Sequence, residues 1–183
     1  MHSETQSFVR QSIMNSIDPF KVLFLCTGNS SRSIMAEYLL RQRGKGAFET
    51  YSAGAHPKGA VNPYTLRVLQ EVYQIDASSA RSKSVDKFLG KPFDFVITVC
   101  DNARETCPIW PARTVVAHWS SPDPALFLGN DHDTFDYFTK VALQIKRRID
   151  LLCNLPLVTL DHDRRERESK DIGEQGKLTD QKQ

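Results

Sequence analysis

Residues 22–33 place a cysteine, a run of small residues and an arginine in an order that suits anion chemistry. The apolar run at residues 22–25 predicts a buried strand that ends at Cys26. The five residues that follow are mostly small, so successive backbone N–H groups can converge on one point and form a nest for a tetrahedral anion. Arg32 then adds a planar fork of donors, which suits a phosphate-like dianion better than a lysine does. A helix beginning near Ser33 directs its positive end at the same point.

Cys26 lies at the bottom of this predicted nest, where positive potential favours a thiolate at neutral pH. We expect Ser31 or Ser33 to cap the following helix. The side chain of Asn29 is expected to bond to the backbone and hold the turn open, in a left-handed conformation that asparagine tolerates. The residues predicted to bind the anion are Thr27, Gly28, Asn29, Ser30, Ser31 and Arg32.

Cys26, five intervening residues and Arg32-Ser33, placed after one strand near the N-terminus, resemble the low-molecular-weight protein tyrosine phosphatase superfamily. That superfamily includes the thioredoxin-coupled arsenate reductases, and the resemblance extends over about residues 20–152. Ser52-Ala53-Gly54 also matches a motif of the family. The alternative is a buried cysteine at a strand end, followed by an ordinary turn.

The other cysteines distinguish the branches of this superfamily. Cys100 ends the apolar run at residues 93–99, and Cys107 follows seven residues later, before a proline. The segment at residues 98–111 is similar to the redox segment of thioredoxin-coupled arsenate reductases, whereas tyrosine phosphatases of this fold do not usually carry the pair. The alternative is that Cys100 is a small core residue and Cys107 an incidental loop thiol. We assign no role to Cys153.

Asp123 lies between two prolines, which hold its loop stiffly. The resemblance implies that this carboxylic acid protonates the leaving group.

One departure from the family concerns the position before Arg32, where many members carry a second cysteine and this chain has Ser31. A thiol partner for Cys26 must therefore come from Cys100, from Cys107 or from another molecule.

Lys83 marks a second departure from the family. Arg81-Ser82-Lys83 resembles a segment that lies behind the anion loop, where some reductases carry an acidic residue and bind potassium. We infer that the Lys83 ammonium group substitutes for the metal ion, the alternative being an ordinary surface lysine. No metal or organic cofactor is expected.

Composition and hydrophobic pattern limit the possible domain organisation, partners and location of the protein. Its 183 residues, 40% hydrophobic and 25% charged, suit a single domain at residues 20–155, between a flexible leader (1–19) and a charged tail (156–183) that is disordered or a frayed helix. A net charge of +2 argues against nucleic-acid or membrane partners. The absence of a secretion signal and of a membrane span predicts a cytoplasmic protein. Strands are predicted at 21–26, 48–52, 93–99 and 114–119, and helices at 33–43, 63–73 and 133–152.

This alternation predicts an α/β fold, and the resemblance implies a four-stranded parallel sheet with helices on both faces.

The resemblance also implies that the protein reduces arsenate. Cys26 attacks arsenic while Arg32 and the loop neutralise charge and Asp123 protonates the departing oxygen; Cys100 then attacks Cys26, and Cys107 passes the disulfide to thioredoxin or a similar dithiol. The first alternative is a phosphatase that hydrolyses phosphate monoesters through a phosphocysteine at Cys26. The second is a non-enzymatic anion or thiol sensor. We further expect residues 101–107 to be partly helical when reduced and looped out when oxidised.

Overall fold

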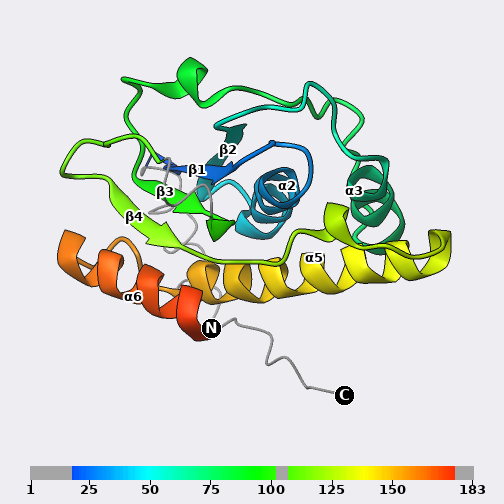
Figure 1. Cartoon of the computed structure of the whole chain (residues 1–183). Coiled ribbons are helices and arrows are strands. Elements are labelled where there is room, and N and C mark those ends of the chain that lie inside the picture. Colours follow the sequence, from blue (N-terminus) through cyan, green and yellow to red (C-terminus); the bar gives the residue numbers. More distant parts are fainter. Residues whose placement is uncertain (1–17, 102–106, 176–183) are drawn as a thin grey trace, which may run out of the picture.

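The computed structural model describes residues 18–101 and 107–175, which fold around one parallel sheet (Figure 1). The order of its strands is β2-β1-β3-β4. They are β1 (Phe20–Cys26), β2 (Phe48–Gly54), β3 (Phe95–Thr98) and β4 (Val115–His118). The predicted four-stranded parallel sheet is confirmed, and each strand lies within two residues of its expected bounds.

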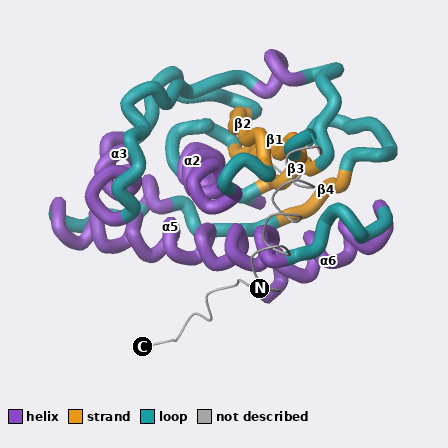
Figure 2. Tube along the Cα trace, turned by 180° about the vertical axis from the view of Figure 1, so that it is seen from behind, coloured by secondary structure: helices purple, strands orange, loops and turns teal. Residues whose placement is uncertain are grey.

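The strands bury both of their faces. Val22 and Phe24 of β1 pack into the larger core, whereas Leu23 and Leu25 pack into a smaller one on the opposite face. The larger core is covered by α2 (Arg32–Gly44), α3 (Pro63–Arg67), α5 (Asp131–Asn154) and α6 (His162–Gln175), as Figures 1 and 2 show from opposite sides. On the smaller core, the described residues form only a short 3₁₀ helix, Val85–Phe88, and loops.

The parallel arrangement brings the functional loops together. All strand pairs are parallel, and Leu25 of β1 lies in register with Thr98 of β3. The carboxyl ends of the strands therefore share one edge, which is where active sites of open α/β sheets assemble. Cys26 ends β1 at this edge, and Cys100 follows the end of β3 by two residues.

The predicted helices form with small differences at their ends. The expected helix at 63–73 is α3 followed by a π-helical stretch, Val68–Val72. Helix α2 begins at Arg32, and neither expected serine caps it: Ser31 occupies the N-cap position without a side-chain bond to the backbone, and Ser33 lies inside the helix. At α5, the side chain of Asn130 accepts a hydrogen bond from the backbone of Asp133 and caps the first turn.

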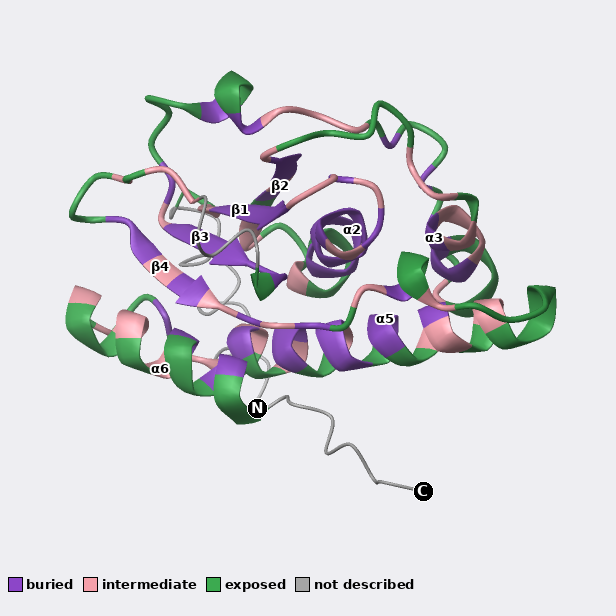
Figure 3. Ribbon diagram, in the orientation of Figure 1, coloured by how far each residue is buried: buried purple, intermediate pink, exposed green. Residues whose placement is uncertain are grey.

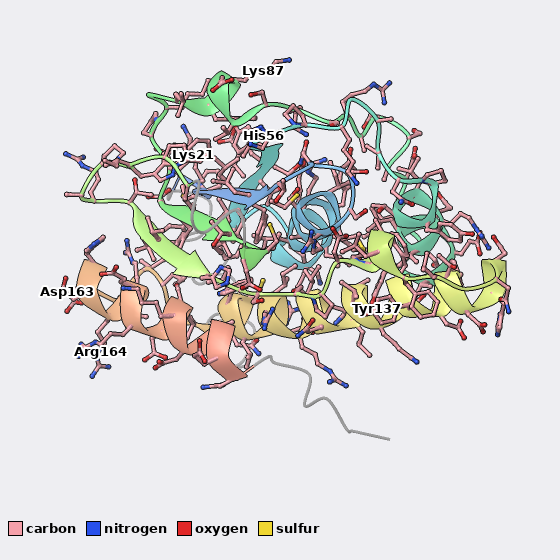
Figure 4. All side chains as sticks on the ribbon, in the orientation of Figure 1. Lys21, His56, Lys87, Tyr137, Asp163 and Arg164 are labelled. Carbon is pink, nitrogen blue, oxygen red and sulfur yellow. The ribbon has the colours of Figure 1, made fainter. Side chains whose placement is uncertain are left out.

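Of the two alternatives expected for the charged tail, disorder or a helix, residues 162–175 form a helix, α6. The carboxylate of Asp161 accepts the backbone N–H of Arg164 at 2.8 Å and supplies a cap. Only Ser169, Ile172 and Gly173 of this helix are buried, and α6 packs against β4 (Figure 3). The exposed side chains of Asp163 and Arg164 point away from the sheet (Figure 4). Three buried residues out of fourteen give little hydrophobic signal, so the sequence pattern did not reveal the helix.

The remaining parts of the leader and tail, residues 1–17 and 176–183, lie outside the described residues, as do residues 102–106 of the expected redox switch. No helix in the described part of the chain combines the length and the apolar character needed to span a bilayer.

Candidate active site

The loop after β1 turns its carbonyl groups outward. The carbonyl oxygens of Cys26, Thr27, Gly28 and Ser30 accept backbone hydrogen bonds of 2.8–3.1 Å from residues 55, 56, 58 and 62. In a trans peptide, the carbonyl and the next N–H point in opposite directions, and no described peptide is cis. The N–H groups of residues 27, 28, 29 and 31 therefore point to the inside of the loop, the direction that a nest for an anion requires.

The sulfur of Cys26 lies within this ring of donors. The backbone N–H of Asn29 donates to Cys26 Sγ at 3.1 Å, and Ser33 Oγ lies 2.9 Å from the same sulfur. Cys26 is buried, with 3% of its surface exposed. The sulfur therefore lies at the bottom of the loop, with hydrogen-bonding groups directed at it.

The Asn29 side chain fixes the direction of the bond between Ser33 and Cys26. Asn29 Oδ1 accepts the backbone N–H of Lys83 at 2.6 Å, which leaves Nδ2 to donate to Ser33 Oγ at 2.8 Å and to Ser52 Oγ at 2.9 Å. Since Ser33 already accepts a bond, its own proton is directed to the sulfur of Cys26. Asn29 has φ 42° and is fully buried, so the left-handed turn and the backbone bond expected at this residue are confirmed.

The network continues from Ser52 to an ion pair between buried Glu37 and partly buried Lys83. Ser52 Oγ donates to Glu37 Oε2, and the Lys83 ammonium lies 3.4 Å from that carboxylate oxygen and 3.3 Å from Ser52 Oγ. Lys83 also donates to the carbonyl of Arg81 at 3.0 Å. The lysine is therefore bonded behind the anion loop and is not an ordinary surface residue.

Gly54 allows the loop to pack against the end of β2. A Cβ atom at this position would lie 2.7 Å from the Thr27 carbonyl oxygen and 2.8 Å from the Asn29 nitrogen. Any larger residue would push the loop away from Ser52 and Lys83. In the Ser52-Ala53-Gly54 motif, Ser52 thus supplies a hydroxyl group to the network behind the loop, and Gly54 leaves room for the loop itself.

Arg32 and Asp123 face each other across the mouth of the loop. Arg32 Nη2 lies 2.8 Å from Asp123 Oδ2, and Nη1 donates to the Ser121 carbonyl at 3.1 Å. The Asp123 carboxylate also accepts the backbone N–H of Ala125 at 3.1 Å. An oxyanion that enters the nest must compete with Asp123 for the guanidinium group, which brings the acid next to the bound anion.

One cleft of about 830 Å³ contains most of the predicted site. Cys26, Arg32, Cys100 and Asp123 line it together, as do all predicted anion-binding residues except Asn29, which lies behind the sulfur. Thr27 Oγ1 lies 3.4 Å from Cys100 Sγ and connects the two cysteine-bearing loops. His56, labelled in Figure 4, and Lys58 add cationic or polar side chains to the cleft wall.

Cys107 is not brought into this cleft. It lines a separate cavity of about 320 Å³ with residues of β4 and α6, including His118 and Lys170. Its half-buried thiol packs against the smaller core beside Trp110. Burial raises the pKa of the Cys107 thiol above its ordinary value of 9.0.

A hydrogen-bonded series ties the start of the Cys100–Cys107 segment to β4. His118 Nε2 lies 2.9 Å from Asp101 Oδ1, and His118 Nδ1 lies 2.7 Å from Thr98 Oγ1. The carboxylate can only accept, so Nε2 donates to it. The hydrogen bond from His118 lowers the pKa of Asp101.

Several of these residues were missed in the sequence. Ser52 could have been found, because β2 ends beside β1 and Ser52 pairs with Phe24 in register. Glu37 lies among the apolar positions of α2, and a carboxylate there signals a buried partner. Ser121 and His118 carry no comparable signal, because their partners lie far away in the chain. Ser33 was expected only as a helix cap, although its partners Cys26 and Asn29 are close to it in the sequence.

Comparison with known proteins gives a consistent picture. The family described as low molecular weight phosphotyrosine protein phosphatase matches residues 21–165. The chain is 37% identical over 128 residues to an arsenate reductase of Halalkalibacterium halodurans, a match that covers 70% of this chain and 91% of that relative.

Two solved structures share the fold. An arsenate reductase from Archaeoglobus fulgidus is 30% identical, with a TM-score of 0.58 over 73% of this chain and 99% of that one. An arsenate reductase in a phosphate-binding state is 29% identical, with a TM-score of 0.57 over 73% and 96% of the two chains. Together with the geometry of the Cys26 loop, these matches show that the chain belongs to the low molecular weight phosphotyrosine protein phosphatase family.

Proposed function

We propose that this protein reduces arsenate to arsenite through a relay of Cys26, Cys100 and Cys107. By its similarity to curated relatives, the chain is an arsenate reductase of the low molecular weight phosphatase family. The observation that carries the finer proposal is that Cys26 and Cys100 line one cleft with Arg32 and Asp123. A phosphatase needs only one of these two thiols.

The first step forms a bond between sulfur and arsenic. Arsenate enters the nest of N–H groups and replaces Asp123 as the partner of the Arg32 guanidinium group. The Cys26 thiolate, bonded to Asn29 and Ser33, attacks arsenic. An As–O bond breaks, and Asp123 protonates the departing oxygen, which leaves as water.

The second and third steps are thiol exchanges. The Cys100 thiolate attacks the sulfur of Cys26, the S–As bond breaks, and its electron pair stays on arsenic, which leaves as arsenite with As(III). The Cys26–Cys100 disulfide that results is then attacked at Cys100 by the Cys107 thiolate. This exchange frees Cys26 as a thiolate and forms a Cys100–Cys107 disulfide.

An external dithiol closes the cycle by supplying two electrons to the Cys100–Cys107 disulfide. We propose thioredoxin or a protein of the same chemistry as this partner, and a cytoplasmic location follows from that requirement. Cys107 starts in its own cavity, so the exchange requires the segment between Cys100 and Cys107 to move.

The second candidate function is hydrolysis of phosphate monoesters. The contact between Arg32 and Asp123 favours it, because the same acid can protonate an ester oxygen while water resolves a phosphocysteine at Cys26. This reaction uses neither Cys100 nor Cys107.

One experiment separates the two functions. Arsenite formation is measured with thioredoxin, thioredoxin reductase and NADPH, beside hydrolysis of p-nitrophenyl phosphate, for the wild type and Cys100→Ser. We expect Cys100→Ser to lose arsenite formation and to keep ester hydrolysis. Cys153→Ser serves as the matched control and should change neither activity. Arsenite formation at the wild-type rate in Cys100→Ser would overturn the relay.

A further inference from the structure

Arg148 of α5 is a buried charge that the reaction steps above do not use. Its residue surface is fully buried, although its guanidinium group carries five N–H donors. A charge in such a place is costly unless hydrogen bonds compensate for the lost water. Burial lowers the pKa of Arg148 to about 10, so the group is still charged at neutral pH.

The acceptors of Arg148 lie on the loop that leads to Asp123. Nη1 donates to the carbonyl of Trp119 at 3.0 Å, the carbonyl of Ser120 at 2.7 Å and the hydroxyl of Ser121 at 3.0 Å. Three consecutive residues between β4 and Asp123 are therefore held by one guanidinium group.

Ser121 joins this contact to the cleft. Its backbone N–H donates to the Val99 carbonyl at 3.2 Å, and its own carbonyl accepts from Arg32 at 3.1 Å. Two residues further along, Asp123 meets the other nitrogen of the same Arg32. Pro122 lies between them and restricts the backbone, so the position of Ser121 determines the position of Asp123.

Helix α6 supplies the fourth acceptor. Arg148 Nη2 donates to the carbonyl of Gly173 at 3.1 Å. This carbonyl belongs to the last turn of the helix, where a cation is favourable. The indole N–H of Trp119 donates to the Ser169 carbonyl at 2.9 Å.

Gly173 lets α6 approach the start of this loop. A Cβ atom at Gly173 would lie 2.2 Å from the His118 carbonyl oxygen. Ser169 and Gly173 both lie beyond residue 165, where the match to the family ends.

We propose that Arg148 is a positioning residue, which together with α6 forms a brace that holds the Asp123 loop in place for proton transfer. The brace consists of Arg148, residues 119–121 and the contacts of Ser169 and Gly173. The proposal rests on the proposed role of Asp123 as the acid. It assigns to the C-terminal helix a part in the chemistry of a cleft that it does not line.

The test uses the full chain and two esters that need the acid to different degrees. p-Nitrophenolate leaves readily without a proton, whereas phenolate does not, so phenyl phosphate depends more strongly on Asp123. We expect Arg148→Met to lose about tenfold more kcat on phenyl phosphate than on p-nitrophenyl phosphate, within the roughly 10²–10⁴-fold that a general acid contributes. In the Asp123→Asn background, Arg148→Met should cause no further loss. Arg147→Met, at the exposed neighbouring arginine, should behave as wild type.

Equal losses on both esters, or an additional loss in the Asp123→Asn background, would overturn the positioning role. If Arg148→Met does not fold, Gly173→Ala loosens the brace from the side of α6 and should give the same dependence on the leaving group. A wild-type dependence in Gly173→Ala would also overturn the proposal.

Hydrogen exchange separates failure of the brace from failure of the proposed function. The backbone N–H groups of Trp119 and Ser121 donate to β3 and the residue after it. They should exchange faster in Arg148→Met than in Arg147→Met, whether or not the protein turns over any substrate. Equal exchange would refute the brace, whereas a wild type inactive on both arsenate and esters would refute only the proposed function.

Discussion

Cys26 and Cys107 carry the same functional group in opposite surroundings. The sulfur of Cys26 faces the backbone N–H of Asn29 and the hydroxyl of Ser33, at the end of a strand and the start of a helix. Cys107 packs beside Trp110 on the smaller core, where burial raises the pKa of its thiol. Cys26 is buried and Cys107 half-buried, and two hydrogen-bonding groups lie close to the sulfur of Cys26, whereas desolvation dominates at Cys107.

This difference assigns a different role to each thiol in the proposed cycle. In that cycle Cys26, with hydrogen-bonding groups directed at its sulfur, acts as the first nucleophile. Cys107, whose pKa is raised by burial, acts last, after the segment that carries it has moved. The predictions that follow change one side of this comparison at a time.

Replacement of the nucleophile has the largest expected effect. Cys26→Ser should lower both arsenate reduction and ester hydrolysis by a factor of about 10⁴ or more, because an alcohol does not ionise where a thiol does. Initial rates with both substrates measure this loss. Appreciable turnover of either one would show that the reaction does not use Cys26.

Arg32→Lys should also lose most of both activities, since a point charge does not replace the bidentate fork.

Cys107→Ser tests the other side of the comparison. We expect a burst of about one arsenite per protein molecule and then no turnover with thioredoxin, because the disulfide stays between Cys26 and Cys100. Hydrolysis of p-nitrophenyl phosphate should stay near the wild-type rate. Sustained arsenite formation would mean that the reductant reaches the inner disulfide directly.

Asn29→Gly removes the amide that orients Ser33 while leaving a residue that adopts positive φ freely. Both activities should fall by about 10- to 100-fold, through loss of the hydrogen bonds that direct the Ser33 proton to Cys26. Gln74→Gly is the matched control, since Gln74 is exposed and also has positive φ, at 56°. Similar losses in the two variants would indicate a general effect of glycine on the backbone.

Lys83→Met tests whether the ammonium group takes the place of a cation behind the loop. The variant leaves Glu37 without this partner, so activity should fall by about 3- to 10-fold, the cost of a lost charge-assisted hydrogen bond. Potassium chloride should restore more of it than sodium chloride does. Lys91→Met, at an exposed lysine, controls for the change in net charge. An identical response to both salts would contradict the substitution of ammonium for potassium.

The pH dependence of alkylation gives the smallest effect. The raised pKa means that folding favours the neutral thiol of Cys107, a contribution to stability that is complete below the unfolded pKa and is lost as the pH rises through the folded value. Iodoacetamide should therefore label Cys107 at higher pH in the folded protein than in urea. Burial raises the pKa of Cys153 further, to about 11, so Cys153 should react after Cys107. Mass spectrometry of peptides labelled between pH 7 and 10 measures both rates.

The strands, the long helices and the loop after β1 could be predicted from the sequence alone, since each depends on neighbours in the chain. The apolar run before Cys26 forms β1, the apolar periodicity after residue 130 forms α5, and the small residues up to Arg32 form the nest. The order of strands and helices placed Cys26, Cys100 and Asp123 after strands that end at one edge of the sheet. Their presence in one cleft follows from that topology.

The partners that complete these groups became visible only in the folded chain. The backbone N–H that orients Asn29 comes from Lys83, 54 residues away, and the acceptors of Arg148 come from β4's loop and from α6. Helix α6 is almost entirely polar, and it is held by three buried residues and by hydrogen bonds to Trp119 and Arg148. Hydrophobic burial leaves a periodicity in the sequence, whereas hydrogen bonds between distant residues leave none. These hydrogen bonds could therefore be identified only in the folded structure.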